Sequence, residues 1–135
     1  MAGYSGTPLL KKLGIKSSYT IHIKNEPKAY WDWISPLPER IKIVSRPKKE
    51  TIDFVHLFVT DKEQLEKEFL KLKAGLKREG MLWVSWPKKS AGIYSDLDGN
   101  IVRQQGLSMG LVDVKVCAVN ETWSGLKFMY RIKDR

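Results

Sequence analysis

The chain has 135 residues, of which 42% are hydrophobic and 29% charged, a composition typical of one globular domain, which we expect to span residues 1–135. No apolar run is long enough to cross a bilayer and the N-terminal stretch lacks the apolar core of a secretory signal, so a cytoplasmic protein without a membrane partner is expected. The net charge of +9 favours acidic partners, but no helix-turn-helix, RNP motif or zinc-ligand spacing accompanies it, so specific nucleic-acid binding is not predicted.

The first half of the chain predicts two short helices and three strands. Thr7 and Pro8 are typical of a helix start, with Thr7 as N-cap, and Gly14 is typical of its end. "YTIHI" (19–23) alternates strand-forming residues, and "NEPKAYWDWI" after it predicts a short helix with inward-facing aromatics. "RIKIVS" (40–45) predicts a second strand. The nearly continuous apolar run "TIDFVHLFVT" (51–60) predicts a strand buried on both faces, as in a parallel sheet covered by helices.

The second half alternates helix and strand again. Thr60 through Glu63 predicts a capping box for the clearest helix, which Gly80 would end. "MLWVSW" (81–86) follows as a strand, and "SDLDGNIVRQQGLSMG" (95–110) predicts a helix that begins near Ser95 or Asp96. "LVDVKVCAV" (111–119) and "LKFMYRI" (126–132) predict a closing antiparallel hairpin. The pattern therefore predicts an α/β fold: a three-layer Rossmann-like sandwich with a mostly parallel sheet.

Several stretches resemble known proteins. "FVHLFVTDKEQLEKEFLKLKAGLKREGMLWVSW" is similar to the middle of class I S-adenosylmethionine methyltransferases, and the closing hairpin is similar to their last two strands. More closely, "YSGTPLLKKLGIK", "LWVSWPKKSAG" and "GLVDVKVCAVNETWSGLKF" resemble hallmark stretches of an uncharacterised bacterial family, domain of unknown function 3052. The resemblance implies a trimmed methyltransferase-like fold with no established activity.

The methyltransferase resemblance also implies a cofactor pattern that this chain lacks. A class I enzyme has a glycine-rich turn after its first strand and an acidic residue at the end of its second. Here the first strand ends in "KNEP" (24–27), without glycine, and Pro27 has no backbone N–H to donate. The second ends in "SRP" (45–47), with Arg46 in place of the acid, and too few residues follow for another helix–strand–helix unit. We therefore predict no cofactor and no functional S-adenosylmethionine site.

Other site motifs are also missing from the sequence. It contains no G-x-G-x-x-G, Walker A or G-x-S-x-G pattern, and Cys117 in "VDVKVCAV" fits a buried, inert thiol. His22 and His56 lack a surrounding cluster of ligating residues, so no metal site is predicted. Asp98-Gly99-Asn100 resembles part of a calcium loop, but the remaining ligands are missing, and we interpret it as a helix start.

The carboxyl ends of the predicted strands carry basic and aromatic residues. Because ligands of open α/β sheets bind beyond these ends, they predict a rim for an anionic ligand, formed by Asn25, Glu26, Arg46, Trp86, Lys88, Lys89, Glu121 and Trp123. A structural interpretation of the same residues stays open. Trp83 and Trp86 are three apart and face opposite sides of their strand, where both would pack in the core, with Lys88 and Lys89 in water.

These observations favour a non-catalytic, degenerate methyltransferase-like domain that binds an anionic small molecule or an acidic protein surface. No catalytic, cofactor-binding or metal-ligating residue is assigned. One alternative is an enzyme acting on an anionic small molecule at the carboxyl edge of the sheet, with Glu26, Asp61 or Glu121 as its general base. The other is a weak, nonspecific nucleic-acid binder.

Overall fold

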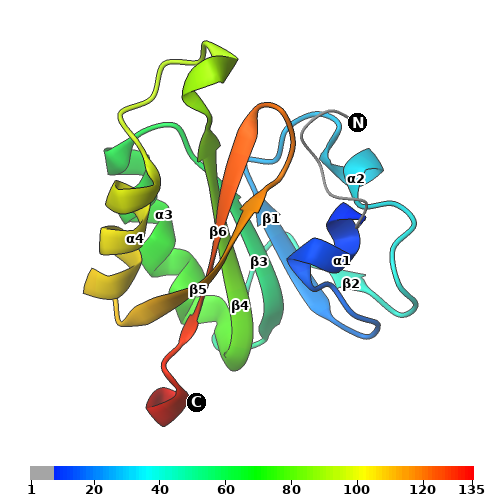
Figure 1. Ribbon diagram of the computed structural model, residues 1–135. Coiled ribbons are helices and arrows are strands. Elements are labelled where there is room, and N and C mark those ends of the chain that lie inside the picture. Colours follow the sequence, from blue (N-terminus) through cyan, green and yellow to red (C-terminus); the bar gives the residue numbers. More distant parts are fainter. Residues whose placement is uncertain (1–7) are drawn as a thin grey trace.

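A six-stranded sheet lies between two layers of helices (Figure 1). The computed structural model describes residues 8–135. Its strands are β1 (Thr20–Lys24), β2 (Lys42–Ile43), β3 (Ile52–Phe58), β4 (Leu76–Pro87), β5 (Leu111–Ala118) and β6 (Trp123–Tyr130). Its helices are α1 (Leu9–Leu13), α2 (Tyr30–Trp33), α3 (Lys62–Gly75) and α4 (Gly99–Ser108), with short 3-10 turns at η1 (Lys89–Ala91) and η2 (Ile132–Asp134).

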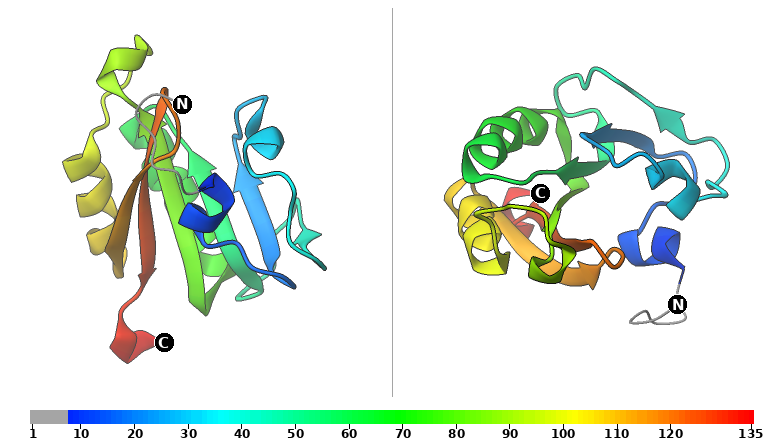
Figure 2. Two further views of the ribbon diagram at one scale, coloured as in Figure 1. Left: turned by 45° about the vertical axis from the view of Figure 1, so that its right-hand side comes forward. Right: turned by 90° about the horizontal axis from the view of Figure 1, so that it is seen from above.

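The strand order is β2-β1-β3-β4-β6-β5. All neighbouring pairs are parallel except those of β6, which runs antiparallel to both β4 and β5. Helices α3 and α4 cover one face of the sheet, while α1 and α2 cover part of the other (Figure 2). The predicted three-layer Rossmann-like sandwich with a closing hairpin is therefore confirmed.

Two apolar clusters fill the two sides of the sheet, as expected for strands that are buried on both faces. One lies under α3 and α4 and includes Trp86, while the other lies under α1 and α2 and includes Trp83. The two indoles thus face opposite sides of β4, which confirms the expectation from their spacing. The Trp83 indole N–H donates to the Leu13 carbonyl at 2.9 Å, which fastens the short helix α1 to the sheet.

Helix α3 differs from the prediction at both ends. Its N-cap is Asp61, whose carboxylate accepts the backbone N–H of Gln64 at 2.8 Å, so Thr60 is not the cap. The helix ends at Gly75, and the chain continues directly as β4 from Leu76. Gly80, the expected end of the helix, lies inside β4, where a Cβ would meet the Ile52 carbonyl oxygen at 2.9 Å.

The acidic turn before α4 caps two helices. Asp98 is the N-cap of α4 and accepts the Ile101 N–H at 2.8 Å, so this helix begins later than Ser95 or Asp96. Asp96 accepts the N–H of Lys62 at the start of α3, at 2.9 Å. The helix-start interpretation of this turn is confirmed, and in residues 8–135 no group of three or more His, Cys, Asp or Glu side chains is arranged to hold a metal ion.

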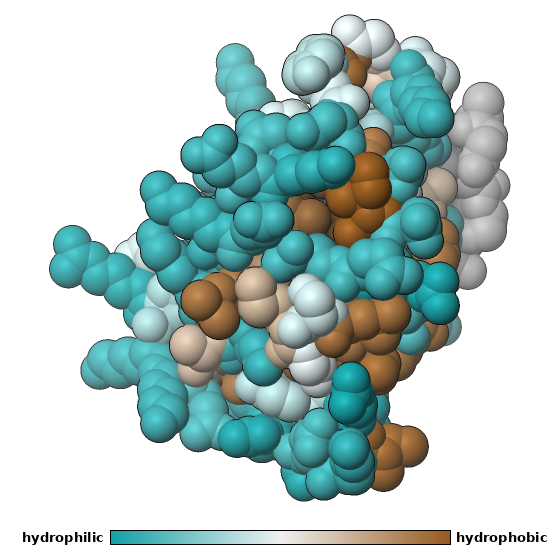
Figure 3. All heavy atoms as spheres, turned by 90° about the vertical axis from the view of Figure 1, so that its left-hand side faces the viewer, coloured by the Kyte–Doolittle hydropathy of each residue, from teal (hydrophilic) through white to brown (hydrophobic). Residues whose placement is uncertain are grey.

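The remaining boundary differences are small. Strand β2 is shorter than the predicted 40–45, and β6 begins at Trp123, three residues before the predicted start. Thr7, the expected cap of α1, lies outside the described residues. The face formed by α3 and α4 is largely hydrophilic, with separate apolar patches (Figure 3), and Leu70 of α3 remains 59% exposed on it. Within residues 8–135, no helix combines the length and the apolar character needed to cross a membrane.

Candidate functional site

The order of the strands reverses between β1 and β3, because β1 leads to β2 on one side while β3 lies on its other side. Such a switch point is where open α/β sheets bind ligands. Asn25, the residue after β1, has a left-handed backbone with φ of 61°. Its side-chain amide donates to the carbonyl oxygen of Phe58, the last residue of β3, at 3.2 Å. The Asn25 side chain therefore bridges the ends of the two strands at the switch point.

The residues after Asn25 turn directly into α2. The Pro27 carbonyl accepts the backbone N–H of Tyr30 at 3.0 Å, and Tyr30 is fully buried. Burial, and secondly the nearby carboxylate of Glu26, raise the pKa of the Tyr30 phenol. This turn is built from side chains and a proline ring, and it leaves little bare backbone for a ligand to approach.

The chain after β2 leaves the sheet before it reaches the carboxyl edge. Strand β2 pairs only with Thr20 and Ile21 of β1, and the Val44 carbonyl then accepts the His22 ring N–H, from Nδ1, at 2.8 Å. The first acidic residue after β2 is Glu50, and its carboxylate lies 3.0 Å from Arg78 Nε at the amino end of β4. No acid therefore stands at the carboxyl end of β2.

Behind the switch point, a chain of hydrogen bonds crosses the core from α2 to β4. The Tyr30 hydroxyl lies 2.9 Å from His56 Nδ1, and His56 Nε2 lies 2.7 Å from the Ser85 hydroxyl. All three side chains are fully buried. Burial lowers the pKa of His56 to about 3, so the imidazole is neutral at physiological pH. The Ser85 hydroxyl is not accessible to solvent, so this chain of hydrogen bonds does not activate a nucleophile. Its role is to hold α2, β3 and β4 together.

The predicted rim is only partly assembled. Trp86 lies in the cluster under α4, whereas Trp123 packs edge-on against Phe58 on the other face, with ring centroids 5.0 Å apart. Lys88 and Lys89 do meet in one place. They line a hollow of about 330 Å³ with Ile93 and the 86% exposed Tyr94, among other residues.

The hairpin turn supplies the next rim residue. Asn120 caps this turn by accepting the N–H groups of Thr122 and Trp123. Glu121 is exposed beside it. Asn25 and Glu26 lie at the switch point after β1. The predicted rim residues are therefore divided: the two indoles lie on different faces of the sheet, and the two lysines lie together at another place.

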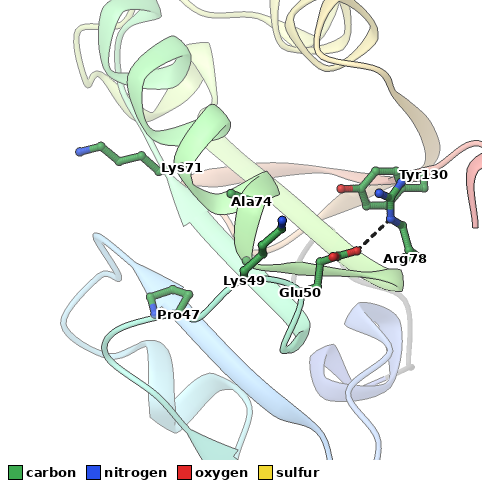
Figure 4. Close-up of a pocket in the computed structure, with 8 residues that line it drawn as sticks. Pro47, Lys49, Glu50, Lys71, Ala74, Arg78 and Tyr130 are labelled. Carbon is green, nitrogen blue, oxygen red and sulfur yellow. Dashed lines mark hydrogen bonds and ion pairs between the residues drawn. The ribbon is translucent and has the colours of Figure 1, made fainter.

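Arg46 is exposed, and the chain that follows it leads toward the amino edge of the sheet. The next residue, Pro47, packs against Gly75 at the end of α3, where a Cβ would lie 2.9 Å from the Pro47 Cβ. Pro47 lines a different hollow, of about 350 Å³, at the amino edge of the sheet (Figure 4). There the Arg78 guanidinium lies over the Tyr130 ring, 4.8 Å from its centroid, and pairs with Glu50.

Solved structures of S-adenosylmethionine-dependent methyltransferases have the same architecture. An Aquifex aeolicus methyltransferase is similar with a TM-score of 0.66 and 12% identity, over 91% of this chain and 88% of that one. A putative type 11 methyltransferase from Sulfolobus solfataricus gives 0.58 and 11%, over 84% and 85%. A TehB-like methyltransferase from Corynebacterium glutamicum gives 0.56 and 9%, over 96% and 91%. The fold is methyltransferase-like. No protein-family model and no curated protein matches the chain.

The residues at the switch point of this methyltransferase-like fold do not fit the cofactor pattern that the resemblance implies. Asn25 occupies the left-handed position that a glycine would take, and its side chain points across to β3. The acid expected after β2 is absent, and residues 44–51 connect β2 to β3 without a further strand. The sequence indicated each of these departures, but not the bond between Asn25 and Phe58.

The Tyr30–His56–Ser85 chain of hydrogen bonds and the exposed Tyr94 were not predicted from the sequence. A polar signal existed for the first: His56 interrupts the apolar run of residues 54–58, and a buried imidazole requires partners. Nothing in the sequence identified which residues those partners are. Tyr94 follows Lys88 and Lys89 closely in the chain, and an aromatic residue in a polar loop was the available signal.

Proposed function

We propose that this chain is a single non-catalytic, methyltransferase-like binding domain in which the adenosyl cofactor crevice has been lost. The observation that supports this most strongly is the hydrogen bond from the Asn25 amide to the Phe58 carbonyl. A class I cofactor needs close approach to bare backbone after the first strand, as the resemblance implies. Here a side chain fills that approach and a neighbouring carbonyl holds it in place.

Two further features support the proposal. No acid that could accept the ribose hydroxyls follows β2 directly, and Glu50, the first acid after it, pairs with Arg78 at the opposite edge. The direct link from β2 to β3 also removes the elements that would complete an adenine pocket. Membership in the domain of unknown function 3052 family is part of this proposal. It rests on the three sequence stretches that resemble that family.

The alternative of an enzyme with an acidic general base has less support. The Asp61 carboxylate is engaged as the N-cap of α3, where it accepts the Gln64 N–H. Glu121 is exposed on the hairpin turn and Glu26 is exposed after β1, so neither lies in an enclosed site that could hold a substrate beside it.

Thermal unfolding with S-adenosylhomocysteine tests the proposal. A ligand at about a hundred times its dissociation constant stabilises a protein by about 2.7 kcal/mol, so even weak binding is visible at millimolar ligand. We expect the melting temperature to match that with equimolar adenosine, the control for nonspecific nucleoside effects. A dose-dependent rise that adenosine does not reproduce would mean that the crevice is functional.

A further inference from the structure

Four lysines meet on the face of the sheet that carries α1. Lys12 belongs to α1 and Lys16 follows it, while Lys115 of β5 and Lys127 of β6 are direct cross-strand partners. The Lys115 ammonium donates to the Lys12 carbonyl oxygen at 3.0 Å. The Lys127 Nζ lies 4.0 Å from the position of a Cβ on Gly14, which ends α1. Both strand lysines therefore reach toward the end of the same helix, and we call these four residues the α1–hairpin lysines.

No carboxylate neutralises the α1–hairpin lysines. None of the ion pairs within residues 8–135 includes any of the four, and residues 1–7 contain neither Asp nor Glu. Two other cations of the sheet and its helices show the contrast. Lys77 pairs with Asp53 and Arg103 with Asp113. Within residues 8–135, the charge of these four clustered lysines therefore has no carboxylate partner.

The arrangement works against the stability of the folded chain. Like charges directly opposite each other on paired strands are destabilising. In agreement, partial burial, and then the charges of Lys115 and Lys16, lower the pKa of the Lys127 ammonium. A surface that only had to remain hydrated would gain stability by replacing either strand lysine with a neutral residue. A bound anion would remove the same repulsion.

We propose that Lys12, Lys16, Lys115 and Lys127 form a binding site for a small ligand that carries several closely spaced phosphate-type charges. The four lysines come from three neighbouring segments and are centred on one cross-strand pair, whose Cα atoms are about 5 Å apart in such ladders. This compact arrangement matches a small polyanion, whereas a nucleic-acid strand is followed by an extended basic groove. The site goes beyond the proposed loss of the adenosyl crevice, because it lies on α1 and the β5–β6 hairpin, away from the switch point between β1 and β3.

Calorimetric titration with inorganic tripolyphosphate at constant ionic strength tests the site. We compare the wild-type chain with Lys115→Gln/Lys127→Gln and with a control of equal charge change, Lys62→Gln/Lys67→Gln, at exposed positions of α3. We expect wild type and control to bind with similar dissociation constants. The hairpin variant should bind at least about tenfold more weakly, which corresponds to about 1.4 kcal/mol. Absence of binding by the wild type, or an equal loss in the control, overturns the proposal.

Three additional measurements keep the result interpretable. The unfolding free energy of the hairpin variant should equal or exceed that of the wild type, because a like-charge pair is removed. A charge-preserving variant, Lys115→Arg/Lys127→Arg, should retain binding, and its loss would contradict a charge-based site. A short single-stranded DNA oligonucleotide forms the last arm. Binding of DNA without binding of tripolyphosphate would overturn the proposal in favour of nucleic acid. The S-adenosylhomocysteine experiment is unaffected by any of these outcomes.

Discussion

The side-chain amide of Asn25 donates to the carbonyl oxygen of Phe58 across a distance of 3.2 Å. This bond joins the ends of β1 and β3 at the point where the strand order reverses. In a methyltransferase-like fold this is the position from which a ligand would be held. Substitution of Asn25 therefore tests whether its side chain stabilises the fold at this position.

Substitution of Asn25 should reveal its structural role. Asn25→Ala removes the hydrogen bond to Phe58. It also places alanine, whose side chain cannot form a hydrogen bond, in the left-handed backbone conformation. We therefore expect the unfolding free energy to fall by about 2 kcal/mol. Asn25→Gly removes the same bond but tolerates the backbone conformation, and should cost less than the alanine variant. Urea denaturation measures both. If the two variants equal the wild type, the bond contributes nothing to the fold.

The buried His56 should make stability depend on pH. The pKa of His56 is about 3 in the folded chain and close to 6.5 in the unfolded chain. Between these two pH values the unfolded state binds a proton at His56 and the folded state does not. The contribution of neutral His56 is thus complete above about pH 6.5 and is lost as the pH falls toward 3. Between about pH 5.5 and about pH 4.5 the loss approaches 1.4 kcal/mol.

Comparison with His56→Gln isolates this effect from the titrating carboxylates. Both proteins share the carboxylates, so the difference between their unfolding free energies reports on position 56. We expect this difference to shift against the wild type as the pH falls, measured by urea denaturation at several pH values. Parallel pH profiles would show that His56 is not held neutral.

Gly106 should be intolerant of a methyl group. It lies in the interior of α4, where alanine normally stabilises a helix by about 1 kcal/mol relative to glycine. Here a Cβ would lie 2.5 Å from Phe128 Cδ1 and closer still to Cε1. The Phe128 ring is fully buried and packs edge-on against Phe69, so we expect Gly106→Ala to destabilise by about 2–3 kcal/mol.

Gly99 provides the matched control for this substitution. It is the first residue of α4, and its nearest contact, Trp86 Cζ2, would be 3.6 Å from an added Cβ. Gly99→Ala should therefore change the unfolding free energy by no more than about 0.5 kcal/mol in the destabilising direction. Equal effects of the two variants would contradict the close packing of α4 on β6.

The thiol of Cys117 should be unreactive in the folded chain. Burial raises its pKa, and the opposing effect of Lys12, Lys115 and Lys88 is smaller. The side chain is 7% exposed and donates to the Ala118 carbonyl at 3.3 Å. Because the thiolate is the reactive form, alkylation by iodoacetamide near neutral pH should be roughly a hundredfold slower than in denaturant. Similar rates in both conditions would place Cys117 at the surface.

The fold could be predicted from the sequence because each element carries its own periodic pattern. The exact ends could not, since competing local signals exist and tertiary contacts choose between them. Thr60 and Asp61 both fit a helix cap, and only Asp61 is placed to accept the Gln64 N–H. Leu76, the first residue after α3, instead pairs with Ile52 of β3, which turns an expected last helical turn into a strand.

The candidate site was less predictable for the same physical reason. The departures from the cofactor pattern are local, so they were visible in "KNEP" and "SRP". The rim depended on how far β2 extends and on the register of the hairpin, and both are set by long-range pairing. The His22 ring donates to the Val44 carbonyl just after the short β2. The pairing of Pro87 with Trp123 places the Trp123 indole on the other face of the sheet from Trp86.

Binding of S-adenosylmethionine, which tests most directly whether the adenosyl crevice is lost, can be measured by equilibrium dialysis. The intact chain is dialysed against methyl-labelled S-adenosylmethionine at millimolar concentration. Equal label on the two sides of the membrane is the predicted result. Saturable excess label on the protein side, displaced by unlabelled S-adenosylhomocysteine, would contradict it.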